Sequence, residues 1–509
     1  MKKDLVIGID SSTTATKAIA WDATGRPVAE GRAPIPLANP GPGLFEQDPA
    51  DWWGSTVAAV RGVLATVDPA RIAAVGISNQ RETVGLFDEG GAPLRPAIVW
   101  LDERAKRQVL SFSATFGEER IHAISGKPRD ITPPVYRFVW LREHEPETWG
   151  RIGRIAEVHA FLTHRLTGEW ATSTASADPM GVLDMAAMDW SGELLAALEL
   201  STTQLPRLVR PGGVTGQVAA AAAAETGLRE GTPVVAAGGD GQCAGTGTDV
   251  FAAGRAYINL GTAVVSGSYG EDYAHDTAFR TMTAVAERGY IYESCVRTGT
   301  FLVDWLVREL FQIDPKQQPT IFSTLEAEAA ASPIGARGLV LVPYWSGCMP
   351  PYWDTSARGV IAGLSASHGR GDVYRAMLEG IALEQAMVTR RIGAAVGRPV
   401  DHYTAIGGGA SSDLWCQILA DASGLAVQRS GTVEASSLGA AMAAAVGAGW
   451  FPSIAQAANA MAGRAVRTFE PRPQAVARYA ELGAIYEELW PALSAWNRRL
   501  SAFAEHDHG

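Results

Sequence analysis

An aspartate followed by hydroxyl residues ends the first apolar run of the chain. Asp10 comes directly after residues 5–9, and Thr13 and Thr14 close the Ser-Ser-Thr-Thr stretch that follows. A turn of this kind offers hydroxyls and successive backbone N–H groups to a phosphate. A carboxylate beside phosphate oxygens can hold Mg²⁺, and Lys17 adds positive charge nearby. An ordinary strand followed by a Ser/Thr turn is the alternative interpretation.

A second acidic residue lies in a glycine-rich segment after another apolar run. Asp240 follows residues 233–237 and two glycines, and Gln242 comes two positions later. A carboxylate placed there could accept the proton of an attacking hydroxyl, which phosphoryl transfer to an alcohol requires. We therefore predict that Asp240 is a general base, with an Asx turn as the alternative.

A third segment reads Gly-Gly-Gly-Ala-Ser-Ser-Asp over residues 407–413, between an apolar run and an amphipathic stretch. The pattern predicts a strand, a glycine turn and a helix. Such a turn lets the backbone approach a flat ligand, although a plain capped connection has the same pattern. The chain lacks a GxxxxGK[ST] loop and a strand–GxGxxG–helix unit, which disfavours Walker-type and Rossmann nucleotide sites.

The elements that must position these segments form two similar units. Apolar runs separated by turn residues predict an antiparallel meander in each half of the chain, at residues 5–9, 17–22 and 27–35, and again at 256–260, 264–269 and 290–294. Further strands at 72–78 and 233–237, a helix near 218–225 and a long helix capped by Asp372 make the class mixed α/β. We predict two lobes, residues 1–247 and 248–509, with a cleft between them.

Composition excludes several classes of protein. With 47% hydrophobic and 19% charged residues over 509 positions, the chain is globular and long enough for two or three domains. A net charge of −11 disfavours nucleic acid as a partner. The four cysteines are widely spaced and are interpreted as core residues. Because no apolar stretch has the length of a signal or a membrane span, we expect a cytoplasmic protein without a membrane partner.

Six motifs in this order resemble those of the FGGY family of carbohydrate kinases. They are Gly8-Ile9-Asp10 with Thr13 and Thr14, Trp100 to Arg104, Gly239-Asp240, Leu260-Gly261-Thr262, Pro350 to Gly363, and Gly407 to Asp413. The resemblance spans nearly the whole chain. It implies the duplicated ribonuclease-H-like fold of actin and the heat-shock ATPases, and an ATP-dependent, Mg²⁺-using kinase of a small sugar or polyol. Members of the family commonly self-associate, so a homodimer is an open expectation.

The resemblance also implies roles for individual residues. Asp240 matches the catalytic aspartate, and Asp10 matches a residue that positions magnesium. The implied ATP contacts are Thr13, Thr14 and Thr262 at the phosphates, Gly299, Thr300 and Asp304 along the nucleotide cleft, and Gly408, Gly409 and Asp413 at the adenosine.

The acceptor segments resemble two branches of the family. Residues 78–83 are similar to the polyol-binding stretch of glycerol kinases, and Arg81 and Glu82 can donate to and accept from neighbouring hydroxyls. Longer segments, such as 130–134 and 140–146, resemble xylulokinases. The remaining candidate lining residues are Trp100, Asp102 and Gln242.

We therefore expect a pentulose such as D-xylulose as acceptor, with glycerol or another polyol as the alternative. A sugar-independent ATPase of the actin or heat-shock type is the alternative from a different class.

Overall fold

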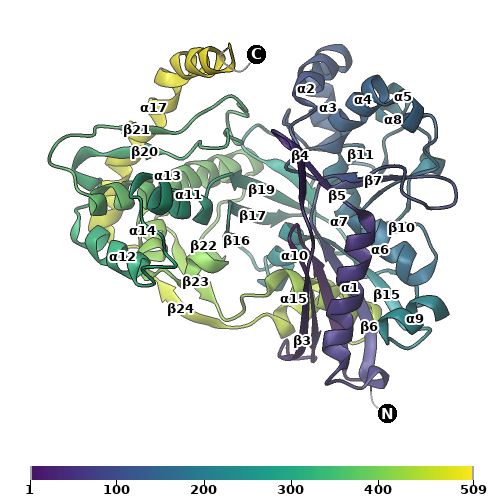
Figure 1. Cartoon of the computed structure of the whole chain (residues 1–509). Helices are drawn as coiled ribbons and strands as arrows, with labels where there is room; N and C mark the ends of the chain where they lie inside the picture. The colour runs from purple at the N-terminus through teal and green to yellow at the C-terminus, as the bar shows by residue number, and fades with distance from the viewer. Residues whose placement is uncertain (1–2, 507–509) are drawn as a thin grey trace.

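The computed structural model describes residues 3–506, which form two lobes, each built on a mixed β-sheet (Figure 1). The first sheet has the order β14-β15-β6-β1-β2-β3. Its strands are β1 (Leu5–Ser11), β2 (Ala15–Trp21), β3 (Pro27–Pro34), β6 (Ile72–Asn79), β14 (Val214–Gln217) and β15 (Pro233–Gly239). The first three strands form an antiparallel meander, and β6 and β15 run parallel to β1.

The second sheet repeats this plan. Its order is β18-β19-β17-β16-β22-β23-β24. Its strands are β16 (Arg255–Leu260), β17 (Val264–Gly270), β18 (Arg280–Thr283), β19 (Tyr290–Val296), β22 (His402–Ile406), β23 (Ala426–Ser430) and β24 (Ala465–Phe469). Strands β16, β17 and β19 form the meander, and β22 and β23 continue in parallel from β16. The predicted duplication is confirmed.

The central strands are apolar because both of their faces are covered. Ile7, Ile9 and Ile77 pack with α1 (Pro49–Leu64) and α6 (Val158–Thr167) on one face of the first sheet. Val6, Ile19 and neighbouring residues pack on the other face against α15 (Ala435–Gly447) and α16 (Ile454–Met461).

Helix α15 comes from the second half of the chain, so the two halves exchange helices. It lies against β1, β6 and β15, and beside α10 (Asp240–Gly247) between the lobes (Figure 1). Helix α10 in turn contacts the second sheet, where Gly245 packs against the ring of Tyr257. Glycines allow this close packing: a Cβ atom on Gly439 would lie 2.0 Å from the carbonyl oxygen of Cys243.

The long helix α13 (Arg370–Val396) begins two residues before the predicted cap. Asp372 lies in its first turn, and its carboxylate accepts a hydrogen bond of 2.9 Å from the backbone N–H of Gly369. The cap is therefore made from within the helix, because an acidic side chain at the third position can reach back to the residue before the helix.

The remaining elements surround this frame. A five-stranded sheet in the first lobe comprises β4 (Ala38–Gly41), β5 (Leu44–Gln47), β8 (Ala97–Ile98), β7 (Val84–Phe87) and β9 (Arg154–Glu157). Strand pairs are β10 (Ala171–Ser173) with β13 (Arg207–Val209), β11 (Leu183–Asp184) with β12 (Asp189–Trp190), and β20 (Val340–Val342) with β21 (Val360–Ala362). The other helices are α2 (Lys106–Phe112), α3 (Glu118–Ser125), α4 (Pro134–His144), α5 (Pro146–Trp149), α7 (Thr174–Ala177), α8 (Gly192–Ala197), α9 (Ala220–Thr226), α11 (Thr300–Trp305), α12 (Ile321–Ala331), α14 (Asp413–Ser423) and α17 (Pro473–His506).

Cysteine placement agrees with the core interpretation. Cys243, Cys348 and Cys416 are buried and Cys295 is half-buried, and all four, which lie in the described part of the chain, are free thiols. Within residues 3–506, no helix combines the length and the apolar character that a bilayer span requires.

Candidate active site

Asp10 and Asp240 lie at the same edge of the first sheet. Asp10 is near the end of β1, and Asp240 is the first residue of α10, directly after β15. Both strands flank β6 and run parallel to it, so their carboxyl ends meet. Ser78, opposite Asp10 on β6, donates from Oγ to Asp10 Oδ1 over 2.8 Å.

The carboxylate of Asp240 raises the proton affinity of Asp10. Burial raises the pKa of Asp10 to about 7, and the neighbouring Asp240 carboxylate adds to the shift. Desolvation also raises the pKa of Asp240, although 39% of its side chain is exposed and Arg81 Nε, 3.1 Å from Oδ1, opposes the shift. A pair of oxygen ligands under mutual repulsion fits a divalent cation that shares its remaining positions with phosphate and water. Among residues 3–506, no cluster of three or more acidic, histidine or cysteine side chains could hold a metal alone.

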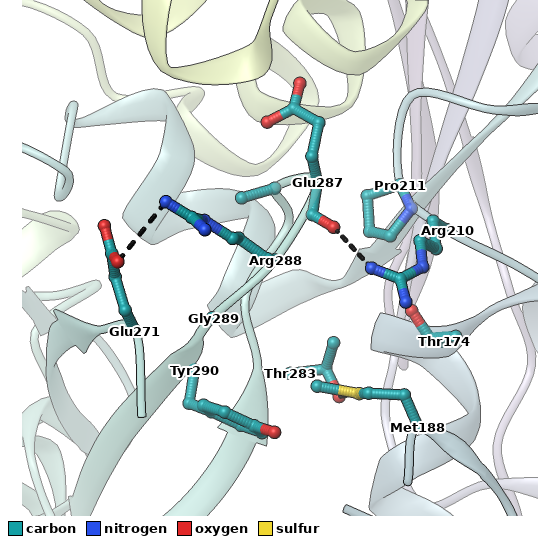
Figure 2. A pocket seen from close by; sticks show the side chains of 11 residues that line it. Thr174, Met188, Arg210, Pro211, Glu271, Thr283, Glu287, Arg288, Gly289 and Tyr290 are labelled. Carbon is teal, nitrogen blue, oxygen red and sulfur yellow. Dashed lines mark hydrogen bonds and ion pairs between the residues drawn. The ribbon is translucent and has the colours of Figure 1, made fainter. Parts of the chain in front are cut away.

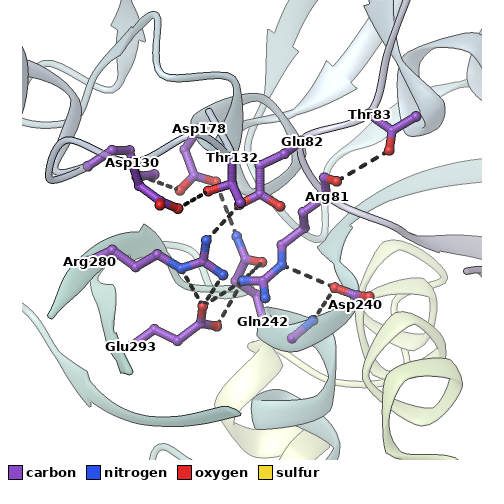
Figure 3. A network of polar contacts seen from close by, with 12 residues as sticks. Arg81, Glu82, Thr83, Asp130, Thr132, Asp178, Asp240, Gln242, Arg280 and Glu293 are labelled. Atoms are coloured by element: carbon purple, nitrogen blue, oxygen red, sulfur yellow. Dashed lines mark hydrogen bonds and ion pairs between the residues drawn. The ribbon is translucent and has the colours of Figure 1, made fainter. Parts of the chain in front are cut away.

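Arg81 and Glu82 belong to a buried ion network that joins the two lobes (Figure 3). Arg81 Nη1 donates to Glu293 Oε2 over 2.8 Å. Arg280 donates from Nη1 to Glu82 Oε1 over 2.8 Å and from Nε to Glu293 Oε1 over 2.7 Å. The sequence analysis did not identify Arg280 or Glu293, because they lie about two hundred positions from Arg81 and carry no local motif.

Gln242 is fully buried beside this network. Its Nε2 donates to Asp178 Oδ1 over 3.1 Å and to the carbonyl oxygen of Ala175 over 2.8 Å. Arg81 Nη1 lies 3.4 Å from Gln242 Oε1. The second oxygen of Asp178 accepts from Lys127 Nζ over 3.1 Å. The structure thus brings Arg81, Glu82, Asp240 and Gln242 together.

Trp100 and Asp102 have different surroundings. Trp100 donates from Nε1 to Thr13 Oγ1 over 2.9 Å, which links its segment to the first phosphate turn. Asp102 is fully buried, and its carboxylate accepts from Arg104 Nε over 2.7 Å and from the Phe45 N–H over 2.8 Å. Its hydrogen bonds therefore go to these groups and not to the Arg81 network.

The two predicted phosphate turns occupy equivalent places in the two sheets. Thr13 and Thr14 lie between β1 and β2, and Thr262 lies between β16 and β17. The N–H of Gly299 donates to the carbonyl oxygen of Thr262, and that of Thr300 to Gly261, each over 2.8 Å. The structure thus brings residues 299 and 300 onto the second turn.

Lys17 reaches across the lobes. Its Nζ lies 2.5 Å from Oε1 of Glu434, the residue before α15. Its charge is therefore paired with the second half of the chain.

The predicted adenosine segment lies beside the end of β16. Gly408 and Gly409 form a short turn after β22, and a Cβ atom on Gly409 would lie 2.6 Å from the Trp415 ring and 2.9 Å from the Leu260 oxygen. Nothing would lie within 4 Å of a Cβ atom on Gly408.

Two predicted nucleotide carboxylates are paired with arginines. Asp413 begins α14, and its Oδ1 lies 2.7 Å from Arg429 Nη2 while Arg467 contacts Oδ2. The hydrogen bond from Arg429 lowers the pKa of Asp413. Asp304 on α11 pairs with Arg308 over 2.7 Å.

A pocket of about 170 Å³ lies elsewhere between the lobes (Figure 2). Its lining includes Arg210, Arg288 and Tyr290 and none of the predicted site residues. Arg210 Nη1 donates to the carbonyl oxygen of Glu287 over 3.0 Å, and Arg288 lies 3.4 Å from Glu271. We therefore place the candidate active site at Asp240 and not in this pocket.

The repeated sheets, with hydroxyl-bearing turns in each and acidic residues at the strand ends, define a protein of the actin-like fold class, in which the fold alone does not assign the activity. The N-terminal domain of the FGGY family of carbohydrate kinases matches residues 5–247, and the C-terminal domain of the same family matches residues 243–448. The chain belongs to the FGGY family and is an ATP-dependent carbohydrate kinase.

The similar proteins carry different substrate names. The chain is 29% identical over 519 residues to a xylulose kinase of Bacillus subtilis, covering 98% of this chain and 99% of the relative. It is 31% identical over 494 residues to a glycerol kinase of Aromatoleum aromaticum, covering 93% and 97%. The crystal structure of a xylulose kinase from Rhodospirillum rubrum superposes with a TM-score of 0.89 at 28% identity, covering 97% of this chain and 99% of that one.

Proposed function

We propose that this enzyme transfers the γ-phosphoryl group of ATP to a hydroxyl of a pentulose such as D-xylulose, with Asp240 as the general base. The observation that carries the proposal is the position of Asp240. Its carboxylate lies at the carboxyl ends of the parallel strands and 3.1 Å from Arg81. Its negative charge raises the pKa of Asp10. In this proposal, Asp240 thus lies between the Arg81–Glu82 pair, which binds the sugar, and the first phosphate turn.

The acceptor binds beside Arg81 and Glu82 in this proposal. A guanidinium donates in a fixed fork and a carboxylate accepts, so the pair suits adjacent hydroxyls of a sugar. Asp240 accepts the proton of the attacking hydroxyl, while the turns at Thr13 and Thr262 hold the phosphates. Asp10 would hold Mg²⁺, which when bound would supply neutralisation of charge on the phosphate oxygens. Most of the rate enhancement then comes from positioning.

The pentulose assignment is supported by the relatives named xylulose kinase, which match almost end to end. Glycerol or another polyol is the second candidate, since Arg81 and Glu82 resemble the polyol-binding pair of glycerol kinases and a relative of that name is 31% identical. The division into lobes at residue 247 and the ATP contacts that the family resemblance implies belong to this proposal.

The test is ADP release from MgATP, measured with D-xylulose, D-ribulose, L-ribulose, glycerol, erythritol and D-arabitol, and without acceptor. The expected result is the highest kcat/KM with D-xylulose. A higher value with glycerol or another polyol selects the second candidate. Equal ADP release without any acceptor contradicts both and indicates a sugar-independent ATPase.

A further inference from the structure

We propose that Arg280 and Glu293 of the second lobe are positioning residues for the acceptor: they orient Glu82 and Arg81 of the first lobe. The inference rests on the acceptor site proposed above and extends it across the lobe boundary. Arg280 lies on β18 and Glu293 on β19, whereas Arg81 and Glu82 follow β6 (Figure 3).

Glu293 is the centre of the network. Its side chain has no exposed surface, and it accepts from Arg81 Nη1 over 3.0 and 2.8 Å, from Arg280 Nε over 2.7 Å and from the Tyr257 hydroxyl over 3.0 Å. Burial alone would raise its pKa, but the two guanidinium groups outweigh burial and lower the pKa to about 2. Glu293 is therefore a fixed negative charge, and both of its carboxylate oxygens accept hydrogen bonds from groups inside the protein.

This arrangement fixes the orientation of the Arg81 guanidinium. Because Glu293 holds Nη1, Nε is turned toward Asp240, 3.1 Å from its Oδ1. A guanidinium is planar, so two fixed nitrogens also fix the third. The direction in which Arg81 can meet an acceptor hydroxyl is thus set by a residue of the other lobe.

Glu82 is held in the same way. Arg280 Nη1 donates to Glu82 Oε1 over 2.8 Å, and Arg137 Nη2 donates to the backbone oxygen of Glu82 over 2.6 Å. The backbone of Glu82 has φ 56°, a conformation that a non-glycine residue keeps only when its surroundings impose it. Binding groups whose neighbours lock them recognise a substrate more tightly than mobile ones.

The experiment compares Glu293→Gln and Arg280→Lys with the wild type. Each variant should raise the acceptor KM about tenfold or more, as expected when a charged hydrogen bond is lost, and should leave the KM for ATP within about twofold. The matched control is Glu379→Gln, because Glu379 is also buried and paired with an arginine, Arg375, over 2.7 Å. It should lower the melting temperature without changing the acceptor KM.

A double-mutant cycle separates positioning from general structure. If Glu293 acts through Arg81, then Glu293→Gln should change the acceptor KM less than about twofold in an Arg81→Gln background. The inference is overturned if Glu293→Gln raises the acceptor KM as much in the Arg81→Gln background as in the wild type. It is also overturned if neither Glu293→Gln nor Arg280→Lys changes the acceptor KM. If Glu293→Gln does not fold, Arg280→Lys, which keeps the charge, decides the question.

The wild-type acceptor panel is measured first, so the two proposals fail differently. A wild type that phosphorylates another acceptor overturns the pentulose assignment alone, and the cycle then uses that acceptor. An acceptor KM unchanged by Arg81→Gln overturns the acceptor site and this inference together.

Discussion

Asp240 shares its nearest cation with a second carboxylate. Arg81 contacts both Asp240 and Glu293, and the tighter contacts go to Glu293. Arg81 therefore neutralises Asp240 only in part, which leaves a carboxylate that can still accept a proton. A base held in this way is oriented without being blocked.

Replacing Asp240 by Asn should lower kcat by ~10² or more, the usual scale for a positioned base. Binding of ATP and acceptor should change little, because Asn keeps the size of the side chain. Turnover and equilibrium binding, measured on the same preparation, check this prediction. Asp189→Asn, at an exposed position, is the control. Turnover near that of the wild type would remove Asp240 from the mechanism.

The pH profile reports the same carboxylate. In the proposed mechanism activity requires ionised Asp240, and desolvation raises the pKa of this residue while Arg81 opposes the rise. The acid limb of kcat/KM should therefore lie at higher pH than an ordinary aspartate would give. In Arg81→Gln the opposing charge is gone, so the limb should move to still higher pH. A limb that stays in place, or moves to lower pH, contradicts this account.

At the residue scale, local patterns located some groups and not others. Asp10 and Asp240 could be predicted because an acid after an apolar strand is a local signal. Arg280 and Glu293 could not, since only the folded sheets bring them to Arg81. Asp102 is predicted to line the acceptor site; its hydrogen bonds in the structure go to Arg104 and Phe45, and its role at the acceptor stays a prediction.

At the element scale, α15 depends on close contact with α10. An alanine methyl group at position 439 would overlap the backbone oxygen of Cys243, 2.0 Å away. Gly439→Ala should therefore destabilise the fold by ~1–3 kcal/mol, the usual cost of overpacking. Urea unfolding measures the effect. The control is Gly54→Ala on α1, where nothing lies within 4 Å and alanine should stabilise the helix slightly. Equal behaviour of the two variants would contradict the contact.

A buried carboxyl couples α13 to α17. Glu384 accepts from the Tyr344 hydroxyl over 2.9 Å and from the Tyr486 hydroxyl over 2.6 Å, and burial raises its pKa to about 7. The folded protein thus holds this proton more tightly than the unfolded chain, whose glutamates titrate near ~4.3. Stability should therefore fall as the pH rises between those values.

Glu384→Gln removes this ionisation. The free energy of unfolding of the variant, relative to wild type, should increase from pH 5 to pH 8, by ~3 kcal/mol at most. Urea unfolding at both pH values measures it, with Glu488→Gln at an exposed position of α17 as the control. A constant difference between variant and wild type would exclude a titrating Glu384.

The strands were largely predictable because each is a continuous apolar run between turn residues, as at Leu5–Ser11 and Arg255–Leu260. The start of α13 differed by two residues, because Asp372 caps it from inside. The helix exchange had no signal in the sequence. The alanine-rich stretch of α15 is apolar on nearly all sides, and such a helix does not reveal which sheet it covers.

At the scale of the whole molecule, the exchange means that the lobes are not independent folding units. Without α15, residues 1–247 leave Val6, Ile19 and Trp21 uncovered, all of which are buried in the complete chain. We expect this fragment to aggregate when it is expressed alone. Fusing residues 432–462 to it should restore solubility and a cooperative melting transition, whereas a fused segment of α17 should not. A soluble, cooperative fragment 1–247 would contradict this expectation.

The same exchange sets the order in which the protein can mature on the ribosome. Strand β1 is synthesised first, yet one of its faces is covered only by a helix that begins at Ala435. The emerging first half therefore carries an uncovered apolar surface throughout most of translation, a surface of the kind that chaperones bind. The first sheet can close only after residues 435–447 have been synthesised, and we expect slower translation of the second half to lengthen the time for which that surface is exposed.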